Sequence, residues 1–290
     1  MHSEPSSRLD DFNDTLRDLP GTRLDAGRDG SAFVAAQGAQ VLSWQAGDGI
    51  ERLYLSPGTG GMTRDGRKAM PIRGGVPVCF PQFSDRGAMV KHGFARDFPW
   101  RMNEPAQASV TMTLHDDDAS RQYWPHAFQA QLDVRLGPGS LEIVFKVVNT
   151  GNEPFSFTTA LHTYLSVDDI RGIQLFGLQS VAYQDATDGC TVKAQQEPGL
   201  AILGEVDRVY MHAPGTVRMV EQDRTLVTIS QRGFFDTVVW NPGPDRARML
   251  ADMPDEDWLH MLCVEAACAS TPVTMAPGAS WEGSQRLSVG

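Results

Sequence analysis

Cysteine and long apolar runs are both scarce in this sequence, and each shortage excludes a class of protein. The four cysteines among its 290 residues form no C-x-x-C pair, and they are Cys79, Cys190, Cys263 and Cys268. This spacing indicates neither a zinc site nor a disulfide scaffold, so we expect reduced thiols in a cytoplasmic protein. No apolar run approaches the length of a membrane span, and the polar N-terminus lacks the apolar segment of a signal peptide.

Positive charge is also in short supply. The chain has 25 Lys and Arg against 36 Asp and Glu, which gives a formal net charge of -11. An acidic surface repels polyanions, so we predict no nucleic-acid partner, and the lack of an apolar span predicts no membrane association. The HExxH, P-loop and GxGxxG motifs are missing as well, so we expect side chains alone to do any chemistry, without a metal or another cofactor.

Short extended runs dominate what is present. They alternate with turn residues, as in residues 31–45, which predict two strands around Gln37-Gly38. Residues 128–136 and 140–149 predict a hairpin, because a Gly-Pro-Gly turn joins them. Many such runs, together with 28 glycines and 18 prolines, predict an all-β sandwich.

The remaining segments fit the same organisation. Residues 51–57 and 155–165 also have the pattern of strands, whereas residues 117–123, which end before a Trp-Pro pair, predict a helical turn. We see no internal repeat and no low-complexity linker. The simplest organisation is therefore a single domain of residues 21–290, preceded by a loosely held arm of residues 1–20.

One basic segment stands out from this acidic background. Residues 61–101 contain eight Lys and Arg against three Asp, a local charge of +5, which leaves -16 for the rest of the chain. Glycine and proline are frequent beside these cations, as expected for a rigid loop that presents fixed donors to an anion. A solvated basic loop is the alternative, and charge clustering alone favours it.

Two residues are candidates for acid–base chemistry. In F-S-F-T-T-A-L-H-T-Y-L, strand alternation places His162 with Thr158 and Tyr164 on the more polar face, although a structural histidine is the simpler interpretation of this strand alone. Glu265 lies in the apolar run L-H-M-L-C-V-E-A-A-C-A. A carboxylate there needs partners or a raised pKa, so either a structural hydrogen-bond network or a catalytic role explains it.

A resemblance to a known family joins these features. The motifs RGGVPVCFPQF and KHGFAR, followed in order by TTALHTYLSVDDI, DRVY, WNPGP and ADMPDEDWLHMLCVEAA, resemble those of the hexose-6-phosphate mutarotases, a branch of the aldose 1-epimerase family. The resemblance covers about residues 30–288. It implies a large antiparallel β-sandwich of the galactose mutarotase type and interconversion of the α and β anomers of a hexose 6-phosphate, with glucose 6-phosphate as the leading substrate. We expect a monomer.

The resemblance also assigns the catalytic pair. The family's histidine occupies the A-L-H-T-Y position of His162, and its glutamate the C-V-E position of Glu265. In the implied reaction Glu265 takes the proton of the C1 hydroxyl while His162 protonates the ring oxygen, and the opened ring closes from the other face. For these roles we expect Glu265 to start ionised and His162 protonated.

Phosphate recognition is expected from the basic segment. Arg73 and Arg96 are the best candidates, because each guanidinium offers a planar fork to two phosphate oxygens. An ion pair with Asp97 or a neighbouring acid is the alternative role of Arg96. Lys91 either adds to the phosphate contacts or points into solvent, since relatives often carry a neutral polar residue there.

Sugar recognition is expected from two other residues. Asp207 in E-V-D-R-V-Y matches the sugar-binding aspartate of the family, with a surface acid paired with Arg208 as the alternative. His92 either binds a sugar hydroxyl or shapes the loop. Trp240 marks a strand end where an aromatic face lines a pocket, and the acidic run of residues 252–257 is expected to be a solvated loop.

Two other functions stay open from the sequence. A mutarotase for unphosphorylated sugars would use the same pair with a different pocket rim. A non-catalytic sugar-binding sandwich is the alternative from another class. Glu265 argues against it, because binding alone needs no carboxylate opposite a histidine.

Overall fold

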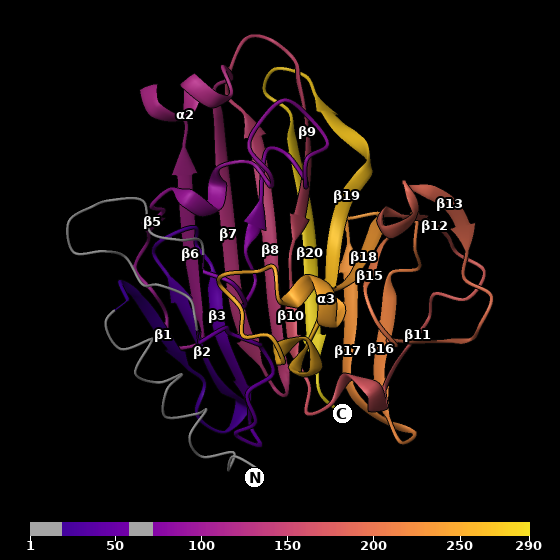
Figure 1. Ribbon diagram of the computed structural model, residues 1–290. Helices are drawn as coiled ribbons and strands as arrows, with labels where there is room; N and C mark the ends of the chain where they lie inside the picture. Colours follow the sequence, from indigo (N-terminus) through magenta and orange to yellow (C-terminus); the bar gives the residue numbers. More distant parts are fainter. Residues whose placement is uncertain (1–18, 58–71) are drawn as a thin grey trace.

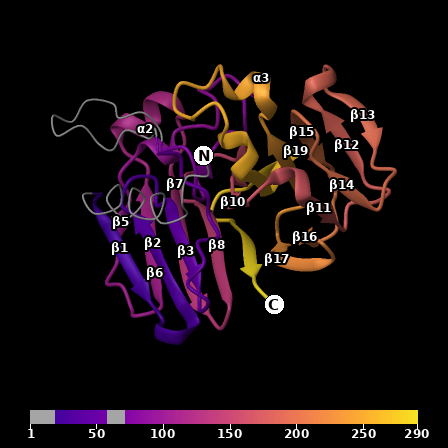
Figure 2. The same cartoon turned by 60° about the horizontal axis from the view of Figure 1, so that its bottom comes forward.

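Antiparallel strands form nearly all of the regular structure (Figure 1). The computed structural model describes residues 19–57 and 72–290. The smallest sheet contains, in order, β1 (Gly21–Asp25), β2 (Gly30–Ala35) and β3 (Val41–Ala46). Figure 2 shows this sheet beside the strands β5 to β8 of a larger one.

Two large sheets account for the other strands. The nine-stranded sheet has the order β14 (Gly199–Ala201), β11 (Ile173–Phe176), β16 (Thr216–Glu221), β17 (Arg224–Arg232), β20 (Ser280–Ser288), β8 (Ser140–Asn149), β7 (Phe128–Gly137), β6 (Ser109–His115) and β5 (Arg101–Met102). The eight-stranded sheet has the order β13 (Thr191–Ala194), β12 (Ala182–Asp185), β15 (Val206–Tyr210), β18 (Asp236–Asn241), β19 (Met261–Met275), β9 (Phe155–Leu161) and β4 (Val78–Cys79), with β10 (Tyr164–Ser166) also paired to β19.

Helices are few and short in the described residues. The α-helices are α2 (Asp118–Tyr123) and α3 (Gly243–Ala247), and the 3-10 turns are η1 (Gly27–Asp29), η2 (Ala95–Asp97), η3 (Ile170–Gly172), η4 (Ala186–Asp188) and η5 (Asp257–His260). Asp117 caps α2, because its side chain accepts from the amide of Ser120 while the Ser120 hydroxyl accepts from the Asp117 amide. None of these helices is long and apolar enough to cross a membrane.

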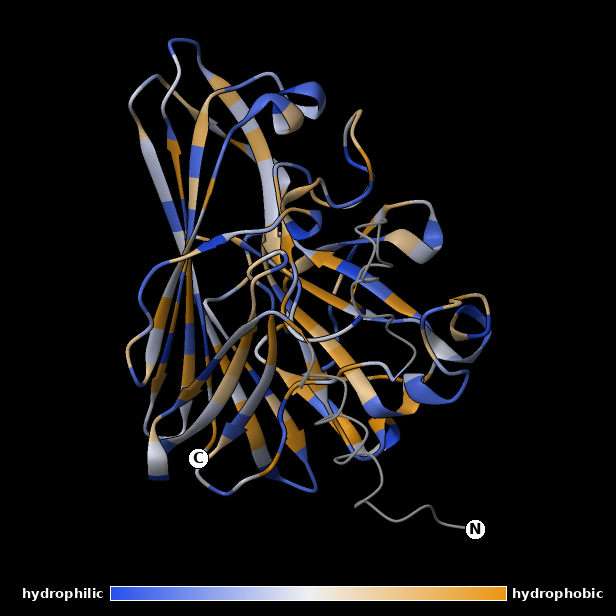
Figure 3. Cartoon of the chain, turned by 90° about the vertical axis from the view of Figure 1, so that its left-hand side faces the viewer, coloured by the Kyte–Doolittle hydropathy of each residue, from blue (hydrophilic) through white to orange (hydrophobic). Residues whose placement is uncertain are grey.

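Burial distinguishes the two large sheets. Strand β7 alternates buried and more exposed positions, so the nine-stranded sheet packs only one face against the core. Along β19, by contrast, every residue from Met261 to Ala269 is buried. Many strands in Figure 3 show the alternation of hydrophobic and hydrophilic positions that a half-buried sheet requires.

The two faces of β19 have different neighbours. Leu262, Val264 and Ala266 belong to the main hydrophobic core, whereas Cys263 and Ala267 belong to smaller clusters. Because successive side chains of a strand point to opposite faces, Glu265 lies on the same face as Cys263. The carboxylate therefore points away from the main core.

The structure confirms the predicted all-β sandwich and several of its parts. Strands β2 and β3 pair around Gln37-Gly38, and β7 and β8 form the expected hairpin. Residues 51–57 differ, since they contribute only isolated bridges, such as that between Leu53 and Leu165. The run 155–165 is also interrupted between β9 and β10, where the amide of Thr163 donates to the carbonyl of Leu161 instead of to a neighbouring strand.

Some predictions are not tested. Nearly all of the arm of residues 1–20 lies outside the described residues, as do Arg64, Arg67 and Lys68 of the basic segment. The division into arm and domain stays a prediction.

Candidate active site

A pocket of about 350 Å³ lies over the face of the eight-stranded sheet that carries Glu265. Alternate residues of β15 and β18, among them Val209 and Val238, form its floor beside Glu265. All seven residues predicted from the sequence line it: Arg73, Lys91, His92, Arg96, His162, Asp207 and Glu265. The structure thus brings together the whole predicted set, while their individual roles stay predictions.

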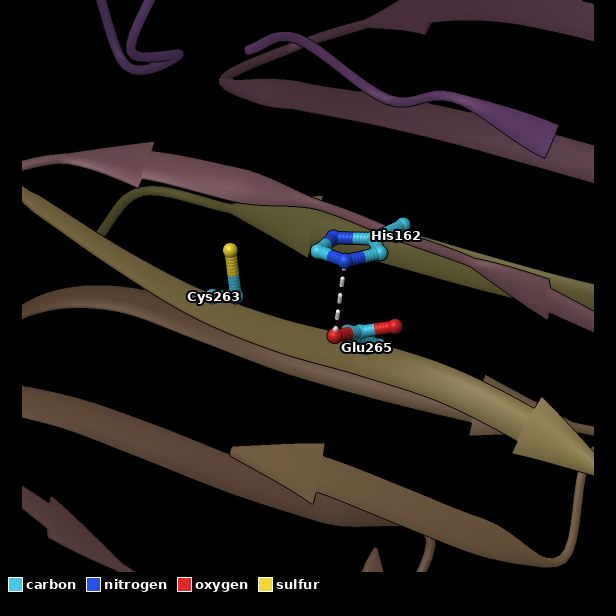
Figure 4. A group of neighbouring side chains, drawn as sticks. All are labelled: His162, Cys263 and Glu265. Atoms are coloured by element: carbon cyan, nitrogen blue, oxygen red, sulfur yellow. Dashed lines mark ion pairs between the residues drawn. The ribbon is translucent and has the colours of Figure 1, made fainter. Parts of the chain in front are cut away.

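The predicted catalytic pair is in direct contact. Nε2 of His162 lies 3.4 Å from Oε1 of Glu265 (Figure 4). His162 follows the end of β9, where its amide donates to the carbonyl of Pro77 at 3.0 Å. Its imidazole faces β19, and the Glu265 side chain is only 1% exposed. The two side chains, which come from different strands, therefore form one acid–base couple.

Burial sets the protonation of this couple. Desolvation raises the pKa of Glu265 well above its usual range, and the nearby charge of Asp207 adds to the effect. Desolvation also lowers the pKa of His162 to about 3, assisted by the positive charges of Arg96 and Arg73. Burial therefore favours the uncharged form of both groups, which are a protonated carboxyl and a neutral imidazole. These shifts run opposite to the expectation that Glu265 starts ionised and His162 protonated, and the protonation of the couple stays a prediction.

Rings surround the imidazole of His162. Tyr164 stacks on it with centroids 4.7 Å apart and an interplanar angle of 10°. Trp240 meets it edge-on at 6.2 Å and 77°, and His92 at 5.3 Å and 69°. Nδ1 of His162 is buried and has no hydrogen-bond partner within the described residues. Aromatic rings thus surround the imidazole, and Nδ1 adds no hydrogen bond within the described residues.

His92 is tied into the loop that carries it. Its Nδ1 lies 3.1 Å from Sγ of Cys79 and accepts from the amide of Ser84 at 3.3 Å. Burial lowers the pKa of His92, so the ring is neutral. Both His92 and Gly93 have positive φ, and a Cβ at Gly93 would lie 2.2 Å from the carbonyl oxygen of Phe80. These contacts support the loop-shaping role, and its pocket position leaves the sugar contact as a prediction.

Gln82 holds the same loop together, which the sequence did not reveal. Its side chain is 2% exposed. Nε2 donates to the carbonyls of Ser84 at 2.9 Å and Met89 at 3.2 Å, and Oε1 accepts from the Met89 amide at 3.0 Å. One buried amide thus replaces the strand pairing that this glycine-rich segment lacks.

Arg73 and Arg96 both have partners already. Nε of Arg73 donates to Oδ1 of Asp252 at 2.8 Å, and Nη1 donates to the hydroxyl of Tyr164 at 3.4 Å. Nη2 of Arg96 donates to the carbonyl of Lys91 at 3.0 Å. The guanidinium groups are therefore held in place at the pocket, and Arg73 shares its charge with a carboxylate.

The prediction that residues 252–257 form a solvated acidic loop was wrong at two positions. The Asp252 side chain is only 14% exposed beside Arg73. Asp257 is buried, and its Oδ2 accepts from the hydroxyl of Tyr54 at 2.8 Å. An acidic run alone does not reveal these partners, because they come from residues far away in the sequence.

Asp207 lies on β15 opposite Trp240 of β18. Burial raises its pKa, while Lys91 and Arg246 oppose the shift. Arg208 donates to Gln195 and Tyr210. Because neighbouring side chains of a strand point to opposite faces, Asp207 is directed to the pocket and Arg208 away from it.

Within residues 19–57 and 72–290, the group of side chains that could hold a metal ion is the one drawn in Figure 4. Ligand atoms of His162, Cys263 and Glu265 all lie within 4.8 Å of one another. A metal would require the thiolate, but burial raises the pKa of Cys263 well above its ordinary value. This group is therefore better suited to proton transfer than to metal binding.

Comparison with known proteins shows which family and which relatives this chain is similar to. A family model described as Aldose 1-epimerase matches residues 22–288. A protein of Cenchrus ciliaris named "Putative glucose-6-phosphate 1-epimerase" is 35% identical over 279 residues, which cover 91% of this chain and 83% of that protein. A Salmonella typhimurium protein of the same name is 31% identical over 276 residues, which cover 91% and 86%.

Solved structures show the same fold. A crystal structure of a "putative mutarotase" from Salmonella typhimurium superposes with a TM-score of 0.80 at 28% identity, and the match covers 90% of this chain and 87% of that one. A galactose mutarotase related enzyme from Lactobacillus acidophilus has a TM-score of 0.74 at 14% identity, with coverage of 93% and 97%. The sandwich is therefore of the galactose mutarotase type.

Proposed function

Since this chain belongs to the aldose 1-epimerase family, we propose that it interconverts the α and β anomers of an aldohexose 6-phosphate, with glucose 6-phosphate as its substrate. The observation that carries the proposal is the contact of 3.4 Å between His162 and Glu265, in a pocket that cationic side chains also line. The names of the two relatives above support the phosphorylated substrate.

The couple contains the one mobile proton that anomerisation needs. Moving it from Glu265 to His162 creates a carboxylate and an imidazolium without changing the total charge. Glu265 then accepts the proton of the C1 hydroxyl while His162 protonates the ring oxygen, and the bond between C1 and the ring oxygen breaks. After rotation about the C1–C2 bond, the ring closes from the other face and both protons return.

Three cations support binding of the phosphate. Arg73, Lys91 and Arg96 line the pocket, and all three act on the pKa of His162, which places their charges near the couple. A guanidinium can donate to two phosphate oxygens at once. Asp207 offers a carboxylate to the sugar hydroxyls.

The test is exchange NMR with pure α-glucose 6-phosphate, compared with α-glucose at equal concentration. We expect faster exchange between anomers than in buffer for the phosphorylated sugar, and a smaller effect for glucose. Exchange at the buffer rate for both sugars, together with measurable binding, would instead identify a sugar-binding protein.

One observation favours an enzyme for unphosphorylated sugars. Asp252 already partly neutralises Arg73, which reduces the attraction of this cation for a phosphate. Equal acceleration of glucose and glucose 6-phosphate would support this second function.

A further inference from the structure

We propose that Tyr164 positions the imidazole of His162. The ring of Tyr164 stacks on the imidazole, and the hydroxyl of Tyr164 connects this stacked pair to Arg73. This inference rests on the proposed function for its effect on rate, but the contacts that carry it do not.

The need for a positioning residue follows from the contacts of His162. A histidine that transfers protons through one ring nitrogen usually has the other nitrogen fixed by a carboxylate or a carbonyl. Nδ1 of His162 has no such partner within the described residues, although it is buried. Something else must keep Nε2 directed at Glu265.

The ring of Tyr164 meets this need. It lies nearly parallel to the imidazole, at 4.7 Å and 10°, while Trp240 stands edge-on to both rings at 77° and 78°. Two contacts at right angles fix the plane of the imidazole more firmly than either contact alone.

The backbone holds Tyr164 in this position. Its amide donates to the carbonyl of Gly75 at 2.9 Å, and it pairs with Cys263 of β19. The side chain is buried, with an exposed fraction of 5%. Tyr164 and Glu265 are therefore carried by two strands that are hydrogen-bonded to each other.

The hydroxyl of Tyr164 extends the contact to the cationic side of the pocket. It accepts from Nη1 of Arg73 at 3.4 Å, and Nε of Arg73 is held by Asp252 at 2.8 Å. An anion bound by Arg73 would thus act on the ring that orients His162, so the phosphate would affect rate as well as affinity.

Two substitutions separate the ring from the hydroxyl. Tyr164→Leu removes the stack, and we expect kcat to fall roughly 10- to 100-fold on both sugars with little change in KM, because a small misplacement of a catalytic group has effects of this size. Tyr164→Phe keeps the stack but removes the hydroxyl, and we expect kcat on glucose 6-phosphate to fall roughly 3-fold more than kcat on glucose. Tyr183→Leu is the matched control, since Tyr183 is 6% exposed in the same sheet but does not line the pocket.

A second measurement does not depend on activity. A parallel aromatic ring shields the protons above it, so the imidazole protons of His162 should resonate upfield of those of the exposed His115. We expect this shift in the unmodified protein and in Tyr164→Phe, and its loss in Tyr164→Leu. Unshifted His162 resonances in the unmodified protein, or full activity of a folded Tyr164→Leu protein, would overturn the proposal. Absence of epimerase activity from the unmodified protein would instead contradict the proposed function, and the NMR shift would still test the position of Tyr164.

Discussion

Nε of Arg73 and Oδ1 of Asp252 are 2.8 Å apart, so the guanidinium predicted to hold a phosphate is already paired with a carboxylate. Both side chains are largely buried, with exposed fractions of 18% and 14%. The pair fixes the guanidinium but also reduces its charge. Substrate preference therefore depends on both residues.

The first prediction concerns Asp252. Asp252→Asn keeps an oxygen that can accept from Arg73 but removes the negative charge. We expect KM for glucose 6-phosphate to fall roughly 3- to 10-fold, because the cation no longer shares its charge, while KM for glucose stays the same. A higher KM for the phosphorylated sugar alone would show that the charge of Asp252 is needed to position Arg73.

The second prediction concerns Arg73 itself. Arg73→Ala removes a charged donor, and we expect KM for glucose 6-phosphate to rise roughly 10- to 100-fold. KM for glucose should change far less. Arg101→Ala is the control, because Arg101 is an exposed cation of the same basic segment that does not line the pocket. A similar increase for both sugars would contradict a role in phosphate binding.

The third prediction separates catalysis from binding. Glu265→Gln removes the proton acceptor but keeps the size of the side chain. We expect turnover to fall by a factor on the order of 100 to 10,000, with little loss of affinity for the sugar by calorimetry. Glu282→Gln, at an exposed position of β20, should change neither quantity. Normal turnover of Glu265→Gln would remove Glu265 from the mechanism.

The fourth prediction is the pH dependence of the rate. Because burial lowers the pKa of His162 to about 3, we expect the acidic limb of kcat/KM near pH 3. At a pH below this limb, His162 and Glu265 are both protonated, and neither can accept a proton from the sugar. The alkaline limb should lie well above the ordinary carboxyl range, where Glu265 loses the shared proton. The profile is measured after subtraction of the spontaneous rate at each pH, and an acidic limb at the ordinary histidine pKa of 6.5 would contradict this environment.

The fifth prediction is a stability difference with a defined sign. The pKa of Glu265 is raised from 4.5, so its contribution to stability is complete below pH 4.5 and is lost as the pH rises towards the folded value. The pKa of His162 is lowered from 6.5, so its contribution is complete above pH 6.5 and is lost as the pH falls towards 3. The two trends oppose each other between pH 4.5 and 6.5, and only that of Glu265 remains above pH 6.5.

Glu265→Gln should therefore gain stability relative to the unmodified protein as the pH rises above 6.5, until the folded pKa of Glu265 is reached. Denaturant unfolding at several pH values measures this difference. A constant gap across the alkaline range would show that the carboxyl group does not titrate as burial requires.

Much of the fold follows from local patterns in the sequence. The Gly-Pro-Gly turn predicted the hairpin of β7 and β8, and the Trp-Pro pair after α2 predicted its end. Residues 51–57 show the limit of such patterns. They have the sequence pattern of a strand, but they form only isolated bridges, such as that between Leu55 and Gly74.

The sequence predicts those site residues whose chemistry does not fit the residues around them. A carboxylate on an apolar strand distinguishes Glu265 from the sequence alone. Tyr164 and Gln82 gave no such signal, because an aromatic residue on a strand and a glutamine in a loop are both ordinary. The sequence also does not predict which of His162 and Glu265 holds the proton, because this depends on how completely distant segments bury the two side chains.

Val264 and Glu265 are adjacent in β19 and point to opposite faces of the strand, and this arrangement restricts how the protein can evolve. Inserting or deleting one residue earlier in β19 would exchange the two faces of the strand from that point on, which would move the carboxylate into the main core and a valine into the pocket. Length changes in this strand would therefore remove activity and stability in a single step. Evolution can vary the composition of β19 but can change its length only where a compensating bulge restores the alternation.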